Sequence, residues 1–197
     1  MSATSKTGVY RINEIFYSLQ GEGANTGCPA VFVRFSGCNL RCPFCDTDFA
    51  AFTTMSVADL LRQVVAFPSR FIVLTGGEPS LQIDNELLSA LKQEHFTIAI
   101  ETNGTHLLPD GIDWVTVSPK ENSQIVLTQA DEVKVVYIGQ DVERYHSQIK
   151  ASRYYLQPCS TESNGIRTDN VADVVAYCQS HPHWSLSLQT HKLIDIK

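Results

Sequence analysis

The sequence lacks any long hydrophobic run. No stretch of its 197 residues approaches the roughly 20 apolar residues of a membrane span. Residues 1–8 are polar and do not resemble a signal peptide. Basic residues are also few: 15 Lys and Arg stand against 21 Asp and Glu, so no overall positive field is available to hold a nucleic-acid backbone. We therefore expect a cytoplasmic protein that binds neither membranes nor nucleic acid.

Internal repeats, low-complexity tracts and linkers are absent as well, so we expect one domain over residues 1–197. Cysteine, by contrast, occurs six times. Cys28, Cys159 and Cys178 are scattered, and reduced thiols in a cytoplasmic chain explain them best. The other three cysteines lie close together and determine most of the chemistry that the sequence predicts.

Cys38, Cys42 and Cys45 form a CxxxCxxC pattern directly after an apolar segment. Three thiolates can bind three irons of a four-iron cluster and leave the fourth iron free to bind a small molecule. A structural zinc site normally has four ligands, and His95 and His106 are distant in sequence, so a fourth ligand would have to be brought close by the fold. The spacing therefore favours an iron–sulfur cluster over a zinc site.

Apolar, β-branched segments predict strands that are buried on both faces, as in a parallel sheet. These segments are residues 30–35, 71–75, 97–101, 114–118, 132–137, 153–157 and 184–188. Amphipathic patterns predict helices after Ser56, after Asp84 and after Asp169 or Asn170, and more weakly over residues 141–150. The links 102–113 and 119–131 look too irregular for helices. Because a closed eight-fold barrel needs about 250 residues, we expect an α/β fold that is a pared-down, partial (β/α) barrel. It would have six or seven mostly parallel strands and about three main helices.

Polar residues and Gly or Pro turns follow nearly every predicted strand, at the end where α/β folds bind ligands. Gly76 and Gly77 would let the backbone approach a ligand closely, although they could simply form a tight turn. Glu78 could simply cap or brace that turn. Asp46 and Thr47 offer oxygen ligands of the kind that Mg²⁺ prefers, or form a local turn.

Two polar features precede the cysteines. Gln20 and Glu22 lie between glycines and could offer an amide and a carboxylate to the NH groups of a heterocycle, or belong to an ordinary loop. Arg34 lies within an apolar predicted strand. A buried guanidinium needs an anionic partner, which would be a substrate carboxylate or a structural acid.

Together these motifs resemble the 7-carboxy-7-deazaguanine synthase family of the radical S-adenosylmethionine (SAM) superfamily. The likeness covers nearly the whole chain and rests on the segments NEIFYSLQGEG (13–23), CDT (45–47), TGGEP (75–79), ETNG (101–104), SPK (118–120), QP (157–158) and QTHK (189–192). The resemblance implies a lyase of queuosine and 7-deazapurine biosynthesis. Its substrate would be 6-carboxy-5,6,7,8-tetrahydropterin and its product 7-carboxy-7-deazaguanine, with loss of ammonia. Another radical SAM enzyme, such as a glycyl-radical activase, would share the cluster loop but would not need Gln20, Glu22 or Arg34.

The resemblance also implies a site. Cys38, Cys42 and Cys45 match ligands of a 4Fe-4S cluster, and Thr47 matches a Mg²⁺ ligand. The positions that match SAM contacts are Phe44, Cys45, Asp46, Gly77, Ser118, Pro119, Lys120, Gln157, Pro158, Cys159 and Ser160. Those that match substrate contacts are Leu19, Gln20, Gly21, Arg34, Thr75 and Lys197, the last through its carboxylate. No side chain is expected to be catalytic, because a SAM-derived radical carries the chemistry. A homodimer and a flavodoxin- or ferredoxin-like reductant are further implications.

Overall fold

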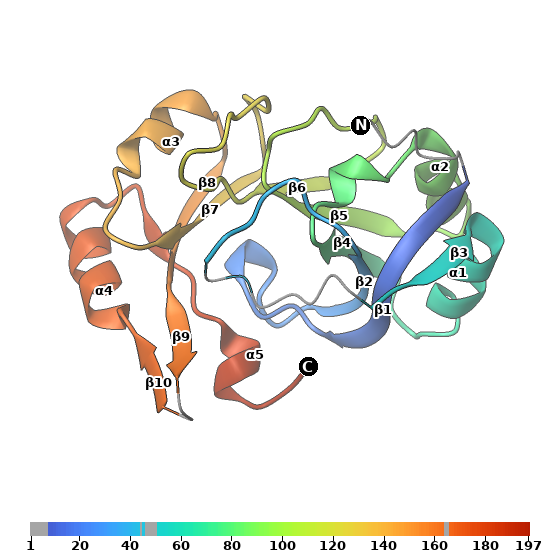
Figure 1. Ribbon diagram of the computed structural model, residues 1–197, viewed down its shortest axis with the longest axis horizontal. Coiled ribbons are helices and arrows are strands. Elements are labelled where there is room, and N and C mark those ends of the chain that lie inside the picture. Colours follow the sequence, from blue (N-terminus) through green and yellow to red (C-terminus); the bar gives the residue numbers. More distant parts are fainter. Residues whose placement is uncertain (1–7, 44, 46–50, 164–165) are drawn as a thin grey trace.

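The structure is a computed structural model and describes residues 8–43, 45, 51–163 and 166–197 (Figure 1). One nine-stranded sheet has the order β11-β8-β7-β6-β5-β4-β2-β1-β3, and β10 pairs with β9 in a separate hairpin. The strands are β1 (Val9–Leu19), β2 (Pro29–Phe35), β3 (Thr53–Ser56), β4 (Phe71–Gly76), β5 (Thr97–Thr102), β6 (Trp114–Val117), β7 (Glu132–Tyr137), β8 (Arg153–Pro158), β9 (Ser160–Ser163), β10 (Ile166–Asp169) and β11 (Ser185–Leu186). The helices are α1 (Val57–Val64), α2 (Asn85–Gln93), α3 (Glu143–Gln148), α4 (Val171–Ser180) and α5 (Thr190–Leu193), with short 3-10 turns at Gly23–Asn25 and Pro79–Leu81.

All seven predicted strands form, and neighbouring ones among them run parallel from β2 to β11. The sheet has two strands that the sequence did not predict. β1 pairs antiparallel with β2 on one side and with β3 on the other. Both lie at one edge of the sheet, where burial on a single face leaves no continuous apolar run. The result is a curved, mostly parallel sheet that does not close, with α1 and α2 outside one part of it and α3 and α4 outside the other (Figure 1).

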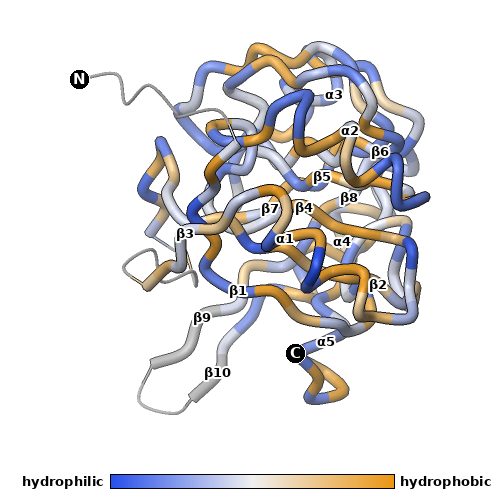
Figure 2. Tube along the Cα trace, turned by 90° about the vertical axis from the view of Figure 1, so that its right-hand side faces the viewer, coloured by the Kyte–Doolittle hydropathy of each residue, from blue (hydrophilic) through white to orange (hydrophobic). Residues whose placement is uncertain are grey.

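Side-chain alternation along the parallel strands separates two faces of the sheet. Val31, Val33 and Phe35 of β2 point outward into the apolar core beneath α1 and α2. A second outer core beneath α3 and α4 includes Val133 and Val135 of β7. Figure 2 shows the apolar stretches of β1, β2 and β4 in orange. The residues between these outward positions face the inside of the curve, and that is where polar side chains collect.

Caps begin two of the helices as the sequence predicts. Ser56 and Asp59 form a capping box before α1, in which each side chain accepts a hydrogen bond from the other's backbone N–H. Asp84 accepts from the Leu87 N–H at the start of α2. Asn170 precedes α4, but its side chain bonds elsewhere: it accepts from the Cys159 N–H and donates to the Tyr137 carbonyl. Asn170 therefore ties the end of β8 to the end of β7 instead of capping the helix.

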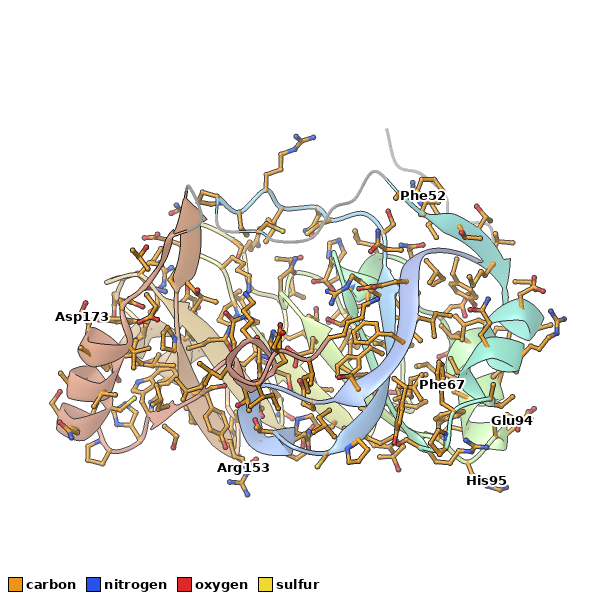
Figure 3. All side chains as sticks on the ribbon, turned by 90° about the horizontal axis from the view of Figure 1, so that it is seen from below. Phe52, Phe67, Glu94, His95, Arg153 and Asp173 are labelled. Carbon is orange, nitrogen blue, oxygen red and sulfur yellow. The ribbon has the colours of Figure 1, made fainter. Side chains whose placement is uncertain are left out.

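The carboxyl ends of the parallel strands lie together at one edge of the molecule. Figure 3 places Arg153, the first residue of β8, at the opposite edge from Phe52, which follows the cysteine loop, and His95, just before β5, lies at the same edge as Arg153. The predicted helix-free links 102–113 and 119–131 lie wholly within the described residues and contain no helix. Among the described residues, no helix is long and apolar enough to span a membrane.

Candidate active site

A cavity of about 330 Å³ opens on the inner face of the sheet, at the carboxyl ends of its strands. Most of the predicted site residues line it together: Leu19, Gln20, Gly21, Arg34, Cys38, Cys42, Cys45, Thr75, Gly77, Ser118, Lys120, Gln157, Pro158, Cys159, Ser160 and Lys197. Pro119 is buried but is not among the lining residues. Phe44, Asp46 and Thr47 lie outside the described residues. Residues from opposite ends of the chain therefore meet at a single site.

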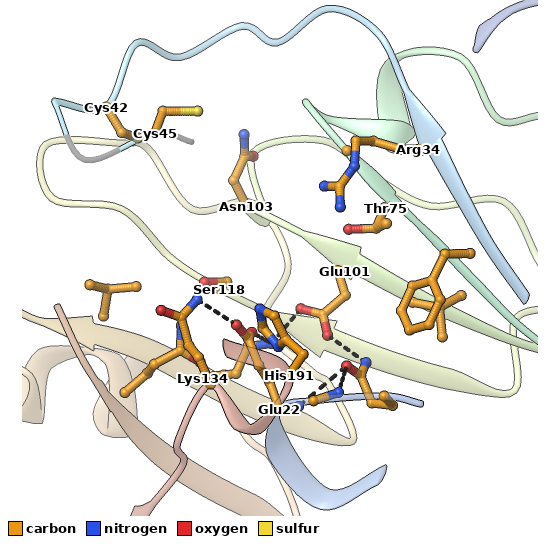
Figure 4. A pocket seen from close by; sticks show the side chains of 18 of the residues that line it. Glu22, Arg34, Cys42, Cys45, Thr75, Glu101, Asn103, Ser118, Lys134 and His191 are labelled. Atoms are coloured by element: carbon orange, nitrogen blue, oxygen red, sulfur yellow. Dashed lines mark hydrogen bonds and ion pairs between the residues drawn. The ribbon is translucent and has the colours of Figure 1, made fainter. Parts of the chain in front are cut away.

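The three cysteines of the CxxxCxxC loop line one end of this cavity. In Figure 4, Cys42 and Cys45 lie above one side of the pocket, while Arg34 and Thr75 point into its other side. Burial raises the pKa of the Cys38 and Cys42 thiols, and the nearby Lys120 ammonium only partly offsets this for Cys42. Because the thiolate is the form that binds metal, a positive metal centre would be needed to stabilise the ionised cysteines.

A buried lysine and two glutamates form the floor of the cavity (Figure 4). Lys134 Nζ lies 2.7 Å from an oxygen of Glu22 and 2.7 Å from an oxygen of Glu101, and the lysine side chain is only 4% exposed. Burial opposes ionisation of Glu22, but Lys134 outweighs it and lowers the pKa of Glu22 to about 2. The two carboxylates likewise outweigh burial at Lys134 and raise the pKa of its ammonium. Glu22 and Lys134 therefore form a charged ion pair on the floor of the cavity.

Residues 20–22 are held to this floor by their own hydrogen bonds. Gln20 Oε1 accepts from the backbone N–H of Gly21 at 2.8 Å, and Gln20 Nε2 donates to Glu101 at 3.3 Å. Gln189 donates to the remaining oxygen of Glu22 at 2.9 Å. A Cβ on Gly21 would lie 2.1 Å from the ring of His191, so only glycine allows this close approach. Segments near both ends of the sequence thus build one binding surface.

Arg34 has the structural acid that its sequence context allowed, and its contact with a substrate carboxylate stays a prediction. Its Nε donates to Glu14 at 2.9 Å, which is a structural ion pair. Its side chain also lines the cavity, where the rest of the guanidinium is available to an anion. Lys197 Nζ lies 2.6 Å from the other Glu14 oxygen, and the Ser18 hydroxyl donates to a main-chain carboxyl oxygen of Lys197. Glu14 therefore places two cations at the edge of the cavity.

Comparison with known proteins agrees with this geometry. A family model described as the radical SAM superfamily matches residues 32–180. The 7-carboxy-7-deazaguanine synthase of Bacteroides thetaiotaomicron is 52% identical over 187 residues, which are 95% of this chain and 98% of that protein. The chain belongs to the 7-carboxy-7-deazaguanine synthase family of radical SAM proteins. A synthase of Neisseria meningitidis serogroup B is 43% identical over 95% of this chain and 94% of its own. The crystal structure of QueE from Escherichia coli is similar with a TM-score of 0.76 and 32% identity, over 93% of this chain and 95% of that one.

The residues of this radical SAM chain fit both an iron–sulfur cluster and SAM. Three soft thiol ligands at the cavity end suit iron. Further along the cavity, Gln157 Oε1 is buried and has no hydrogen-bond donor among the described residues. Since a buried acceptor is normally paired, a ligand N–H in the cavity would satisfy it. Burial lowers the pKa of Lys120, whose ammonium donates to the Ser118 hydroxyl at 2.6 Å.

Glu78, in the segment Gly76-Gly77-Glu78, has a structural role. Its side chain is fully buried and accepts from the Thr102 hydroxyl and from the Asn103 N–H, both at 2.7 Å. It also accepts from the Ser80 N–H at 3.0 Å. Glu78 therefore joins the ends of β4 and β5, and it is not among the residues that line the cavity.

Sequence reasoning missed two functional candidates on β7. Lys134 and Glu132 both face inward, two positions apart on the strand, and Glu132 lies beside the floor. Burial raises the pKa of Glu132 to about 7, against the opposing effect of Lys134. The signal was present in the segment EVKVVY, because charged residues that alternate with valines in a buried strand need partners.

Proposed function

We propose that this protein is itself a 7-carboxy-7-deazaguanine synthase, which converts 6-carboxy-5,6,7,8-tetrahydropterin to 7-carboxy-7-deazaguanine with loss of ammonia. One observation carries the proposal: a single cavity joins the three cluster cysteines to a charged floor and a cavity-facing arginine. Carboxylates accept hydrogen bonds from ring NH groups, and an arginine binds a carboxylate. A carboxylated pterin offers both kinds of group.

A bound 4Fe-4S cluster and SAM would supply a 5′-deoxyadenosyl radical that takes a hydrogen atom from the substrate. Cys38, Cys42 and Cys45 would hold the cluster, and Ser118, Lys120 and Gln157 would hold SAM. The protein's own part is to bind, orient and shield the reacting groups from water. Its cavity is suited to this because it lies inside the curve of the sheet and its walls come from both ends of the chain.

Substrate orientation would rest on groups that are already fixed in place. Glu22 and Glu101 are held by Lys134 and would accept from the pterin ring NH groups. Arg34, held through its Nε by Glu14, would present its remaining N–H groups to the substrate carboxylate. Phe16 and Phe32, whose rings stack at 4.9 Å, also line the cavity and provide an apolar wall. Groups that are positioned before binding lose little entropy when the substrate arrives.

Magnesium and assembly are finer parts of the same proposal. Thr47 would be a Mg²⁺ ligand, so Thr47→Ala should lose the dependence of turnover on Mg²⁺ while Thr47→Ser keeps most of it. The protein would also form a homodimer, and the exposed Leu193 and Ile194 offer apolar surface for one. A flavodoxin- or ferredoxin-like protein would supply the electron.

Product analysis tests the proposal. The enzyme is reconstituted anaerobically and incubated with SAM, reductant, Mg²⁺ and the carboxypterin, and the products are identified by mass spectrometry. We expect the mass of 7-carboxy-7-deazaguanine and equimolar ammonia. Unchanged pterin together with 5′-deoxyadenosine formed at the same rate without it would contradict the proposal and favour a different radical SAM substrate.

A further inference from the structure

A second group of metal-binding side chains lies outside the cavity. Glu143, His146 and His183 each offer a ligand atom, and these atoms lie within 4.8 Å of one another. We propose that this trio binds a divalent transition-metal ion of the zinc type, at a site separate from the cysteine loop.

The fold brings the three residues together from two segments. Glu143 and His146 are three positions apart on α3, so they share one face of the helix. His183 belongs to the link between α4 and β11, where the next residue, Trp184, is buried. A metal ion there would join two segments that are 40 positions apart.

The site lies at the end of the sheet away from the cavity. The His146 ring is 4.5 Å from the ring of Tyr154, the second residue of β8. Pro158, at the other end of β8, lines the cavity. Tyr154 and Pro158 are four positions apart on this extended strand, which separates them by about 13 Å. Occupancy of the metal site therefore does not compete with SAM or substrate for ligands.

The carboxylate is held in an orientation that suits ligation. Glu143 Oε1 accepts from Trp184 Nε1 at 2.8 Å and from the Tyr177 hydroxyl at 3.0 Å. Glu143 Oε2 lies 3.0 Å from His183 Nε2, and the rings of His146 and His183 are 4.5 Å apart. Hydrogen bonds that fix a ligand from behind in this way are typical of metal sites.

The ligand set selects the class of metal. Two imidazoles and one carboxylate are the protein ligands of many zinc sites, and they leave a fourth position for water. Mg²⁺ prefers oxygen ligands and a rigid octahedron, so it would bind poorly here. The alternative is a surface hydrogen-bond cluster centred on the His183–Glu143 pair, which needs no metal.

Zinc binding to defined variants tests the proposal. Because empty cluster cysteines bind zinc, the cluster-loaded enzyme is titrated anaerobically alongside the full chain carrying Cys38→Ala, Cys42→Ala and Cys45→Ala. Zinc and iron per chain are then counted by plasma mass spectrometry after desalting. We expect about one zinc ion per chain in both proteins, unchanged iron in the first, and a higher unfolding temperature with zinc.

Histidine variants in the triple-alanine chain locate the ion. His146→Ala and His183→Ala should each weaken zinc binding by more than about tenfold. His181→Ala is the matched control: its ring stacks on Tyr177 at 4.0 Å and its Nδ1 faces the Tyr177 carbonyl, so it should bind zinc normally. Absence of zinc from the triple-alanine chain, or undiminished binding by a His146→Ala, His183→Ala double variant, would overturn the proposal. His183→Ala should leave deazaguanine formation unchanged.

Discussion

Lys134 and Glu22 are 112 positions apart in the sequence, yet their side chains form an ion pair with an Nζ–Oε2 distance of 2.7 Å. The pair joins β7 to the segment that follows β1, across the inside of the curved sheet. Because Lys134 also binds Glu101, one ammonium organises the two carboxylates that we assign to the pterin ring.

Removal of the Lys134 ammonium should destabilise the folded protein. Lys134→Met is close in length but leaves Glu22 and Glu101, whose side chains are only 17% and 19% exposed, without a cation. We expect the free energy of unfolding to fall by about 3–5 kcal/mol, as for other buried pairs that lose one partner. The measurement is urea unfolding of the anaerobically purified protein.

Lys92 provides the matched control for this prediction. It pairs with Asp113, but both side chains are more than a third exposed, so solvent screens the interaction. Lys92→Met should change stability by less than about 1 kcal/mol. Equal losses of unfolding free energy in the two variants would show that the ion pairs of Lys134 stabilise the protein no more than the exposed Lys92–Asp113 pair does.

Two glycines that follow β1 allow a direct comparison. Gly23 has φ +66° and a Cβ there would lie 2.0 Å from Glu132, whose carboxylate is held by the Ala24 N–H. Gly27 has φ +86°, but a Cβ there would meet no atom within 4 Å in the part of the chain that the structure describes. Both alanine variants should lose about 1–2 kcal/mol through the left-handed backbone. Only Gly23→Ala should also displace the 20–22 segment and raise the KM for carboxypterin by about tenfold or more. A Gly27→Ala variant with the same rise would contradict this assignment.

Glu132 should make stability depend on pH. Burial raises its pKa from 4.5 to about 7, so the folded protein holds this proton more tightly than the unfolded chain. The stability that the protonated Glu132 contributes is fully present below pH about 4.5 and is lost as pH rises through about 7. Between pH 5 and 8, wild type should therefore lose about 2–3 kcal/mol relative to Glu132→Gln. Urea unfolding of both proteins across this range checks the difference, and parallel curves would be inconsistent with the raised pKa.

The cysteine loop yields a simpler prediction. Alanine at Cys38, Cys42 or Cys45 should abolish the brown iron–sulfur chromophore and 5′-deoxyadenosine formation, because the methyl group of alanine cannot replace a thiolate on iron. Cys28→Ala and Cys178→Ala are the controls, since neither residue lines the cavity. A Cys42→Ala variant with a full cluster and full turnover would remove Cys42 from the ligand set.

Much of this fold could be predicted from the sequence, because strands that are buried on both faces appear as continuous apolar runs. β2, β4 and β5 illustrate this. β1 escaped prediction because it lies toward the sheet edge and mixes polar with apolar residues. The hairpin β9–β10 also escaped, because its segments are short and polar.

The residues of the site likewise differ in how far the sequence reveals them. Motif residues such as Gln20 and Arg34 could be found because they resemble a family pattern, and the structure brings both to one cavity. The segment EVKVVY signals that Lys134 needs partners, but its partners could not be named, because Glu22 and Glu101 are distant in sequence and adjacent only after folding. The same holds for Glu132, whose raised pKa results from burial that the sequence does not reveal.

The central claim is that the cavity holds a carboxypterin where its C6 hydrogen meets the SAM-derived radical. The most direct measurement uses carboxypterin deuterated at C6, incubated anaerobically with the reduced enzyme and SAM, followed by mass analysis of SAM and of the product. We predict deuterium in the recovered SAM together with formation of 7-carboxy-7-deazaguanine. Unlabelled SAM and 5′-deoxyadenosine, with all deuterium still on intact carboxypterin, would contradict the account.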